Sequence, residues 1–104
     1  MKKEIKFTKM SAAGNDFVLI DNRNMVVKND HKRFARRVCE RKDGVGADGL
    51  ILIEGSKKAD FKMRIFNRDG SEAEMCGNGA RVFVQFAYDN RIAGGSMSFI
   101  TLAG

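Results

Sequence analysis

Cys76, Gly77 and Asn78 have the residue types and the position for chemistry on a small acid. Cys76 stands just before a segment whose pattern predicts a helix from about Gly77 to Asp89. Unpaired N–H groups and the dipole at a helix N-terminus favour anions and stabilise a thiolate. Gly77 and Gly79 leave room for a ligand to approach the backbone. Although a lone cysteine is more often a small buried hydrophobe, this combination predicts a reactive thiol beside a carboxylate-binding nest.

Two further polar stretches are candidates for contacts with a ligand. Asn67 opens the sequence NRDG, which predicts a turn ending at Gly70 and leading towards Cys76. Asn15 comes shortly before an apolar run, where loop residues commonly contact ligands. Turn chemistry explains Asn15 equally well on the sequence alone.

The elements that must position these residues are strands and two helices. Apolar runs and alternating patterns predict strands at Glu4–Met10, Phe17–Ile20, Leu50–Ile53, Asp60–Asn67 and Ser96–Leu102. The helix at about 77–89 is apolar on nearly every side, so we expect it to be buried. The sequence therefore predicts an α+β fold in which a curved, barrel-like, mostly antiparallel sheet wraps around a buried central helix. We expect residues 1–104 to form a single domain with one core.

A second helix is expected from about His31 to Arg41, capped by Asn29 or Asp30. Cys39 falls on its apolar stripe, and we interpret it as a structural thiol. His31, at the helix start, is interpreted as a solvated surface residue.

Composition excludes several classes of function. No apolar run approaches 18 residues and no secretory signal is present, so we expect a cytoplasmic protein without a membrane segment. No cysteine or histidine spacing predicts a metal site. The net charge of +6 raises nucleic acid as a ligand, but no aromatic residues are interleaved for base stacking. We therefore expect no nucleic-acid partner and interpret the basic cluster as a solvated helix face: Lys32, Arg33, Arg36, Arg37, Arg41 and Lys42.

Three separate segments resemble one enzyme family. SEAEMCGNGAR, around Cys76, resembles the first active-site motif of diaminopimelate epimerases. FTKMSAAGNDFVLID (residues 7–21) is similar to the N-terminal signature of that family, and GVGADGLILIE (residues 44–54) to its middle block. The resemblance implies the same kind of fold, with a barrel-like sheet around a central helix in each half of the enzyme.

The resemblance also implies an activity and a set of roles. Family members invert the α-carbon of diaminopimelate, converting the LL to the meso isomer for lysine and peptidoglycan synthesis, without a cofactor. They use two cysteines, and by motif match Cys76 is the first, catalytic one. Gly77 and Asn78 would hold the α-carboxylate of the amino-acid substrate, and Asn15 and Asn67 would contact its polar groups.

The resemblance is to the N-terminal half of the family alone. The second domain and the second cysteine motif have no counterpart in these 104 residues. We therefore expect a fragment or half-enzyme that needs a complementary second half or forms a homodimer. The alternative is a non-catalytic dimerisation or small-carboxylate-binding module derived from the same fold.

Overall fold

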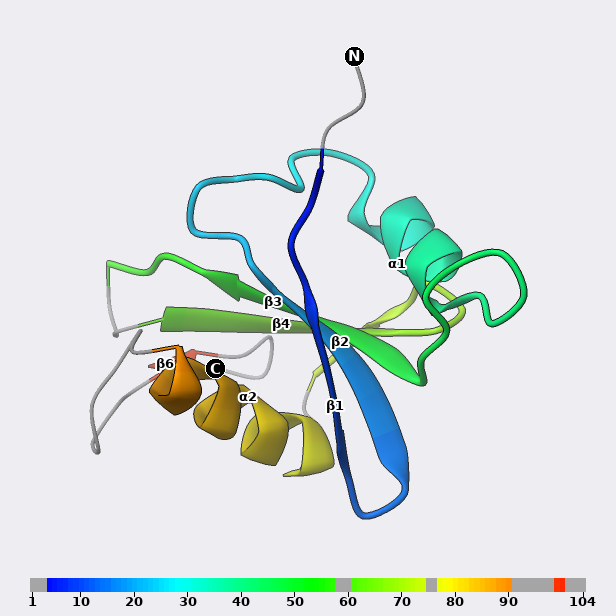
Figure 1. Ribbon diagram of the computed structural model, residues 1–104. Helices are drawn as coiled ribbons and strands as arrows, with labels where there is room; N and C mark the ends of the chain where they lie inside the picture. The colour runs from blue at the N-terminus through cyan, green and yellow to red at the C-terminus, as the bar shows by residue number, and fades with distance from the viewer. Residues whose placement is uncertain (1–3, 58–60, 75–76, 91–98, 101–104) are drawn as a thin grey trace.

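The computed structural model describes residues 4–57, 61–74, 77–90 and 99–100, the last two without their side chains. The predicted α+β class is confirmed: a mixed sheet lies between two helices (Figure 1). The strands are β1 (Thr8–Ala12), β2 (Asn15–Asp21), β3 (Gly49–Glu54), β4 (Phe61–Asn67), β5 (Glu72–Ala73) and β6 (Phe99–Ile100). The helices are α1 (His31–Cys39) and α2 (Gly77–Asp89).

The strand order is β1-β2-β3-β4-β5, with β6 also paired to β4. Three of the described pairings are antiparallel, while β2–β3 and β4–β6 are parallel. Over the described residues the sheet is curved and open rather than closed into a barrel (Figure 1). None of the helices described there is long and apolar enough to cross a membrane.

Strands β2 and β3 are buried on both faces. Alternate residues of β2 point to opposite sides, so that Leu19 packs towards α2 and Val18 towards α1. The α2 side also contains Phe83, which meets Phe61 edge to face at 6.2 Å between ring centroids. Because both faces are covered, β2 and β3 appear in the sequence as continuous apolar runs, as predicted.

Helix α2 begins and ends at the predicted residues, but its burial differs from the expectation. Val82, Phe83 and Phe86 lie on the buried face, whereas Val84 is 39% and Tyr88 58% exposed. The sheet covers α2 from one side over the described residues, and its opposite side is open. The prediction of a helix buried all round is therefore correct for one face.

The N-terminal hairpin differs from the prediction in its bounds. The first strand begins at Thr8 rather than Glu4 and continues through Ser11 and Ala12, beyond the predicted end at Met10. Only Ala13 (φ 49°) and Gly14 (φ 89°) form the turn. Positive φ at both central residues is what a two-residue hairpin turn needs to match the twist of its strands.

The expected side-chain cap of α1 was wrong. Asp30 occupies the N-cap position with left-handed backbone angles, and its side chain makes no capping hydrogen bond. The helix also ends at Cys39, two residues before the predicted end, because Glu40 has an extended backbone.

The interpretation of His31 as a solvated residue was also wrong. Its ring stacks on Phe66 with centroids 6.0 Å apart, and its Nε2 is buried 4.0 Å from Oε2 of Glu54. A neighbouring ion pair joins Arg64 to Glu72 at 2.8 Å, with the Arg64 guanidinium over the Phe66 ring. The helix start is thus anchored on a polar cluster at the sheet surface, which no periodicity in the sequence indicates.

Candidate functional site

The candidate residues gather at one end of the sheet because of its register. Phe17 pairs with Gly49 in parallel, and Gly49 pairs with Asn67 antiparallel. The beginnings of β2 and β3 therefore lie beside the end of β4. Asn15 opens β2 and Asn67 closes β4. These two residues, 52 positions apart in the chain, therefore lie at the same end of the sheet.

The first turn of helix α2 lies at this same end of the sheet. Asn78, the second residue of α2, donates from Nδ2 to Oδ1 of Asn15 at 2.9 Å. Both residues are half-buried. This bond spans 63 positions and joins two of the stretches that the sequence singled out.

Gly77 begins α2 and leaves its backbone open. It is exposed, and among the described residues, apart from its chain neighbours and the backbone of its own helix, no atom lies within 4 Å of where a Cβ would be. The backbone of Gly77 is thus accessible with respect to the described residues, and the approach of a ligand to it stays a prediction. Cys76, the predicted reactive thiol, lies outside the described residues.

Asn67 serves the turn that it opens. Its backbone N–H donates to the carbonyl of Ser71 at 2.8 Å, and its Nδ2 donates to Oγ of Ser71 at 3.0 Å. Asp69 accepts from the Ser71 backbone and hydroxyl, which lowers the pKa of its carboxyl below the ordinary value. The predicted turn is therefore present, and Asn67 remains exposed at the site edge with one amide donor used locally.

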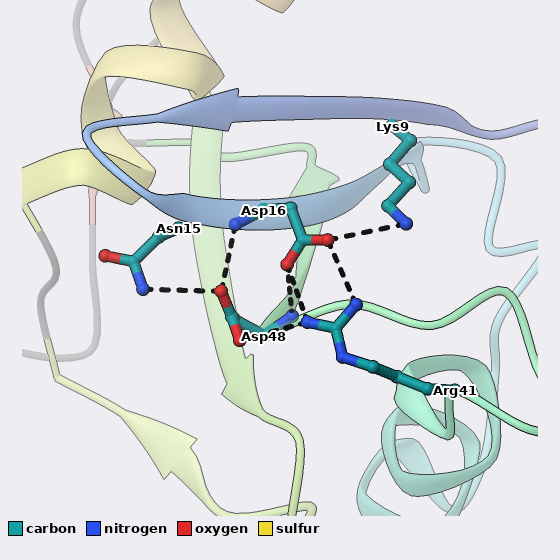
Figure 2. Close-up of polar contacts among 5 residues, drawn as sticks. All are labelled: Lys9, Asn15, Asp16, Arg41 and Asp48. Carbon is teal, nitrogen blue, oxygen red and sulfur yellow. Dashed lines mark hydrogen bonds and ion pairs between the residues drawn. The ribbon is translucent and has the colours of Figure 1, made fainter.

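A network of charged residues lies next to Asn15: Lys9, Asp16, Arg41 and Asp48 (Figure 2). Sequence reasoning missed this network. Asp16 and Asp48 directly precede Phe17 and Gly49, the first residue pair between β2 and β3. Each aspartate accepts the backbone N–H of the other, at 2.9 and 3.1 Å. Arg41 binds both carboxylates, and Lys9 lies 3.4 Å from Asp16.

These cations offset the repulsion between two adjacent carboxylates. The Arg41 guanidinium, with smaller contributions from hydrogen bonds of Asp48 and Lys9, holds the pKa of Asp16 well below its usual range. Parallel pairing of β2 with β3 creates this arrangement, and the sequence contains no direct signal for parallel pairing. The only available clue was an aspartate placed just before each of two buried apolar runs.

Cys39 lies in a different environment. It is 2% exposed within the apolar cluster between α1 and the sheet, and this burial raises the pKa of its thiol to about 11. A thiol of this kind is neutral near pH 7 and packs as a small hydrophobe. The sequence interpretation of Cys39 as structural agrees with this position.

Comparison with known proteins agrees with these motifs. The sequence profile described as diaminopimelate epimerase matches residues 7–104. The diaminopimelate epimerase of Moorella thermoacetica is 52% identical over 99 residues, and that of Archaeoglobus fulgidus is 51% identical over 102 residues. Those alignments cover 94% and 96% of this chain but 36% of each relative. The chain thus spans about a third of the length of the curated relatives that it matches.

Solved structures show the same fold at low sequence identity. A Bacillus anthracis phenazine biosynthesis protein of the PhzF family superimposes with a TM-score of 0.69 at 21% identity, covering 96% of this chain and 32% of that protein. A methylitaconate-delta-isomerase superimposes with a TM-score of 0.69 at 16% identity, covering 88% of this chain and 28% of that protein.

Proposed function

The chain belongs to the diaminopimelate epimerase family, and from that premise we propose that it supplies the Cys76 half of a site that inverts the α-carbon of diaminopimelate. The structural observation that carries the proposal is the hydrogen bond between Asn15 and Asn78. It places two matched motifs of the family together at the first turn of α2.

In the proposed reaction, the first turn of α2 binds the α-carboxylate. Gly77 and Asn78 are the first residues of α2, whose initial N–H groups have no partner within the helix, and a helix N-terminus favours an anion. A bound carboxylate would fix the adjacent α-carbon next to Cys76. The dipole at the same helix end favours the thiolate form of a cysteine placed just before it.

Inversion needs a base on one face of the α-carbon and an acid on the other. We propose that the Cys76 thiolate removes the α-proton from one face of the α-carbon while a second thiol donates a proton to the opposite face. In the reverse direction the two cysteines exchange these roles. An amino-acid α-proton is a very weak acid. The developing negative charge must therefore be stabilised by donors aimed at the carboxylate and by exclusion of water.

The second thiol is not Cys39, which is buried in the α1 cluster with a raised pKa. We propose that it is supplied by a complementary second half or by a second copy of this chain. The relatives, which are almost three times as long as the aligned region, support a need for further residues. Such a half-site also accounts for the open edge beside Gly77.

Exchange of the α-proton tests this function. We expect the chain, incubated with diaminopimelate in heavy water under reducing conditions, to incorporate deuterium at the α-carbon, as followed by mass spectrometry and NMR. Cys76→Ala should abolish incorporation, and Cys39→Ala, which removes the buried thiol, should retain it. Inversion together with exchange would indicate a second proton carrier, and a rate that grows with the square of chain concentration would assign it to a second copy.

Absence of exchange in the folded chain would contradict the catalytic proposal. Binding of diaminopimelate without exchange would then favour the carboxylate-binding module over the enzyme. Equal loss of exchange in both cysteine variants would contradict the assignment of the proton transfer to Cys76.

A further inference from the structure

The side-chain amide of Asn15 has a defined orientation. Its Nδ2 faces Oδ2 of Asp48 at 3.4 Å, and its Oδ1 accepts from Nδ2 of Asn78 at 2.9 Å. In Figure 2 the amide nitrogen is turned towards Asp48 and the oxygen away from it. The oxygen therefore faces the first turn of α2, where one of its two lone pairs is used by Asn78.

Asp48 is the group that sets this orientation. A carboxylate oxygen accepts hydrogen bonds and donates none, so it selects the nitrogen end of the amide. Its Oδ2 also accepts the backbone N–H of Asp16 at 3.1 Å, which fixes that oxygen relative to β2. Arg41 holds the other oxygen at 3.2 Å, and the backbone N–H of Asp48 donates to Asp16 at 2.9 Å.

We propose that Asp48 is a positioning residue that turns the oxygen of Asn15 towards the ligand side of the site, so that Asn15 accepts from the ammonium group of an amino-acid substrate. This inference rests on the function proposed above. The helix end offers N–H donors for the carboxylate, and the oriented Asn15 offers an acceptor beside them. Together they distinguish an α-amino acid from a simple carboxylic acid.

The orientation itself is tested by NMR on the ¹⁵N-labelled chain without ligand. The Asn15 side-chain amide protons and the Asp16 backbone N–H both donate to one oxygen, so we expect a nuclear Overhauser effect between them. Asp48→Ala should remove this signal and speed hydrogen exchange of the Asn15 amide. Asp48→Asn, which retains an acceptor oxygen, should retain the nuclear Overhauser effect.

Ligand selectivity is tested with two probes, diaminopimelate and pimelate, which has the same carboxylates and no amino groups. Asn15→Ala and Asp48→Ala should each weaken diaminopimelate binding by about tenfold, the size expected for one hydrogen bond to a charged group. The double variant should bind no more weakly than either single variant, because Asp48 acts through Asn15. Pimelate binding should stay unchanged within about twofold, on the scale of ordinary surface changes.

Asp21→Asn is the matched control. Asp21 lies at the other end of β2 and pairs with Arg23 at 2.8 Å, so its substitution also removes an ion pair from the same strand. It should leave both affinities and the Asn15 signals unchanged.

Three results would overturn the proposal: an Asn15 amide whose protons contact Asn78 instead, additive losses in the double variant, or equal weakening of pimelate. If the chain binds neither probe, the proposed function fails by itself, and the NMR signals of the free chain decide the role of Asp48.

Discussion

Asp16 and Asp48 place two carboxylates side by side, and the chain surrounds them with hydrogen-bond donors and cations. Each accepts a backbone N–H, and Arg41 bridges them at 3.0 and 3.2 Å. Such a pair is costly unless cations and donors surround it. The pair lies next to Asn15, with Asp48 facing the Asn15 amide. This position agrees with the proposal that Asp48 orients that amide.

This arrangement predicts a pH dependence of stability. The pKa of Asp16 is lowered in the folded chain, mainly by Arg41, so the folded state favours the ionised carboxylate. That stabilisation is fully present above the unfolded pKa of about 4 and is lost progressively as the pH falls from there towards the lower pKa of the folded state. Urea unfolding at a series of pH values should show a falling free energy of unfolding from about pH 5 to pH 3.

Asp16→Asn should be less stable at neutral pH and should show a smaller fall on acidification. Asp43→Asn is the control, because Asp43 is exposed in the neighbouring loop and forms no ion pair within the described part of the chain. An unchanged acid response in Asp16→Asn would contradict the charge network.

Among the elements, the turn between β4 and β5 contains a strict glycine position. Gly70 has φ 96°, and a Cβ there would lie 2.7 Å from the carbonyl oxygen of Lys32 in α1. Gly70→Ala should therefore lower the free energy of unfolding by at least about 2 kcal/mol, since a strained backbone alone costs about 1–3 kcal/mol. Urea unfolding measures the change.

Gly55→Ala is the matched control. Gly55 is exposed, and in the described part of the chain nothing beyond its two neighbours lies within 4 Å of where a Cβ would be. Its change should stay within about 0.5 kcal/mol. Equal effects of the two substitutions would show that the turn does not need glycine at position 70.

One apolar face of helix α2, which packs on the sheet, stabilises the fold. Phe83 is fully buried between α2 and the sheet, so Phe83→Ala should cost about 3–5 kcal/mol in the free energy of unfolding. Val84→Ala, its 39% exposed neighbour, should change stability by less than about 0.5 kcal/mol. Comparable losses from both would indicate that the outer face of α2 is covered in solution.

Most elements were predictable because their patterns are local. The apolar runs of β2 and β3, the NRDG turn and helix α2 all carry a distinct composition. The predictions that failed depend on tertiary contacts. His31 is half-buried against the ring of Phe66, and α1 lacks the side-chain cap that its sequence offers.

The sequence could name residues that lie together at this end of the sheet but not their contacts, and their role in binding a substrate stays a prediction. Motif resemblance indicated Asn15, Gly77 and Asn78, and the structure places all three at one edge. Asp48 and Arg41 could not be assigned, because their contacts with β2 depend on parallel pairing between strands 28 residues apart in the chain. Asn67 lies at the same edge, and its contact with a substrate stays a prediction.

At the scale of the whole molecule, the described residues form an open unit. The sheet covers α2 on one side, and Tyr88 on the other side is 58% exposed. The edge at Gly77 is also open. These features agree with the proposal that a second half or a second copy completes the site.

We propose Cys76, and not Cys39, as the reactive thiol. The most direct test is the pH dependence of alkylation by iodoacetamide, measured in Cys39→Ala so that Cys76 is the only thiol. We predict an apparent pKa below the free-cysteine value of about 8.5, because of the helix N-terminus that follows. In Cys76→Ala the remaining Cys39 should stay unreactive at pH 8, since burial raises its pKa to about 11. A Cys76 pKa at or above the free value would contradict the account and leave the thiol structural.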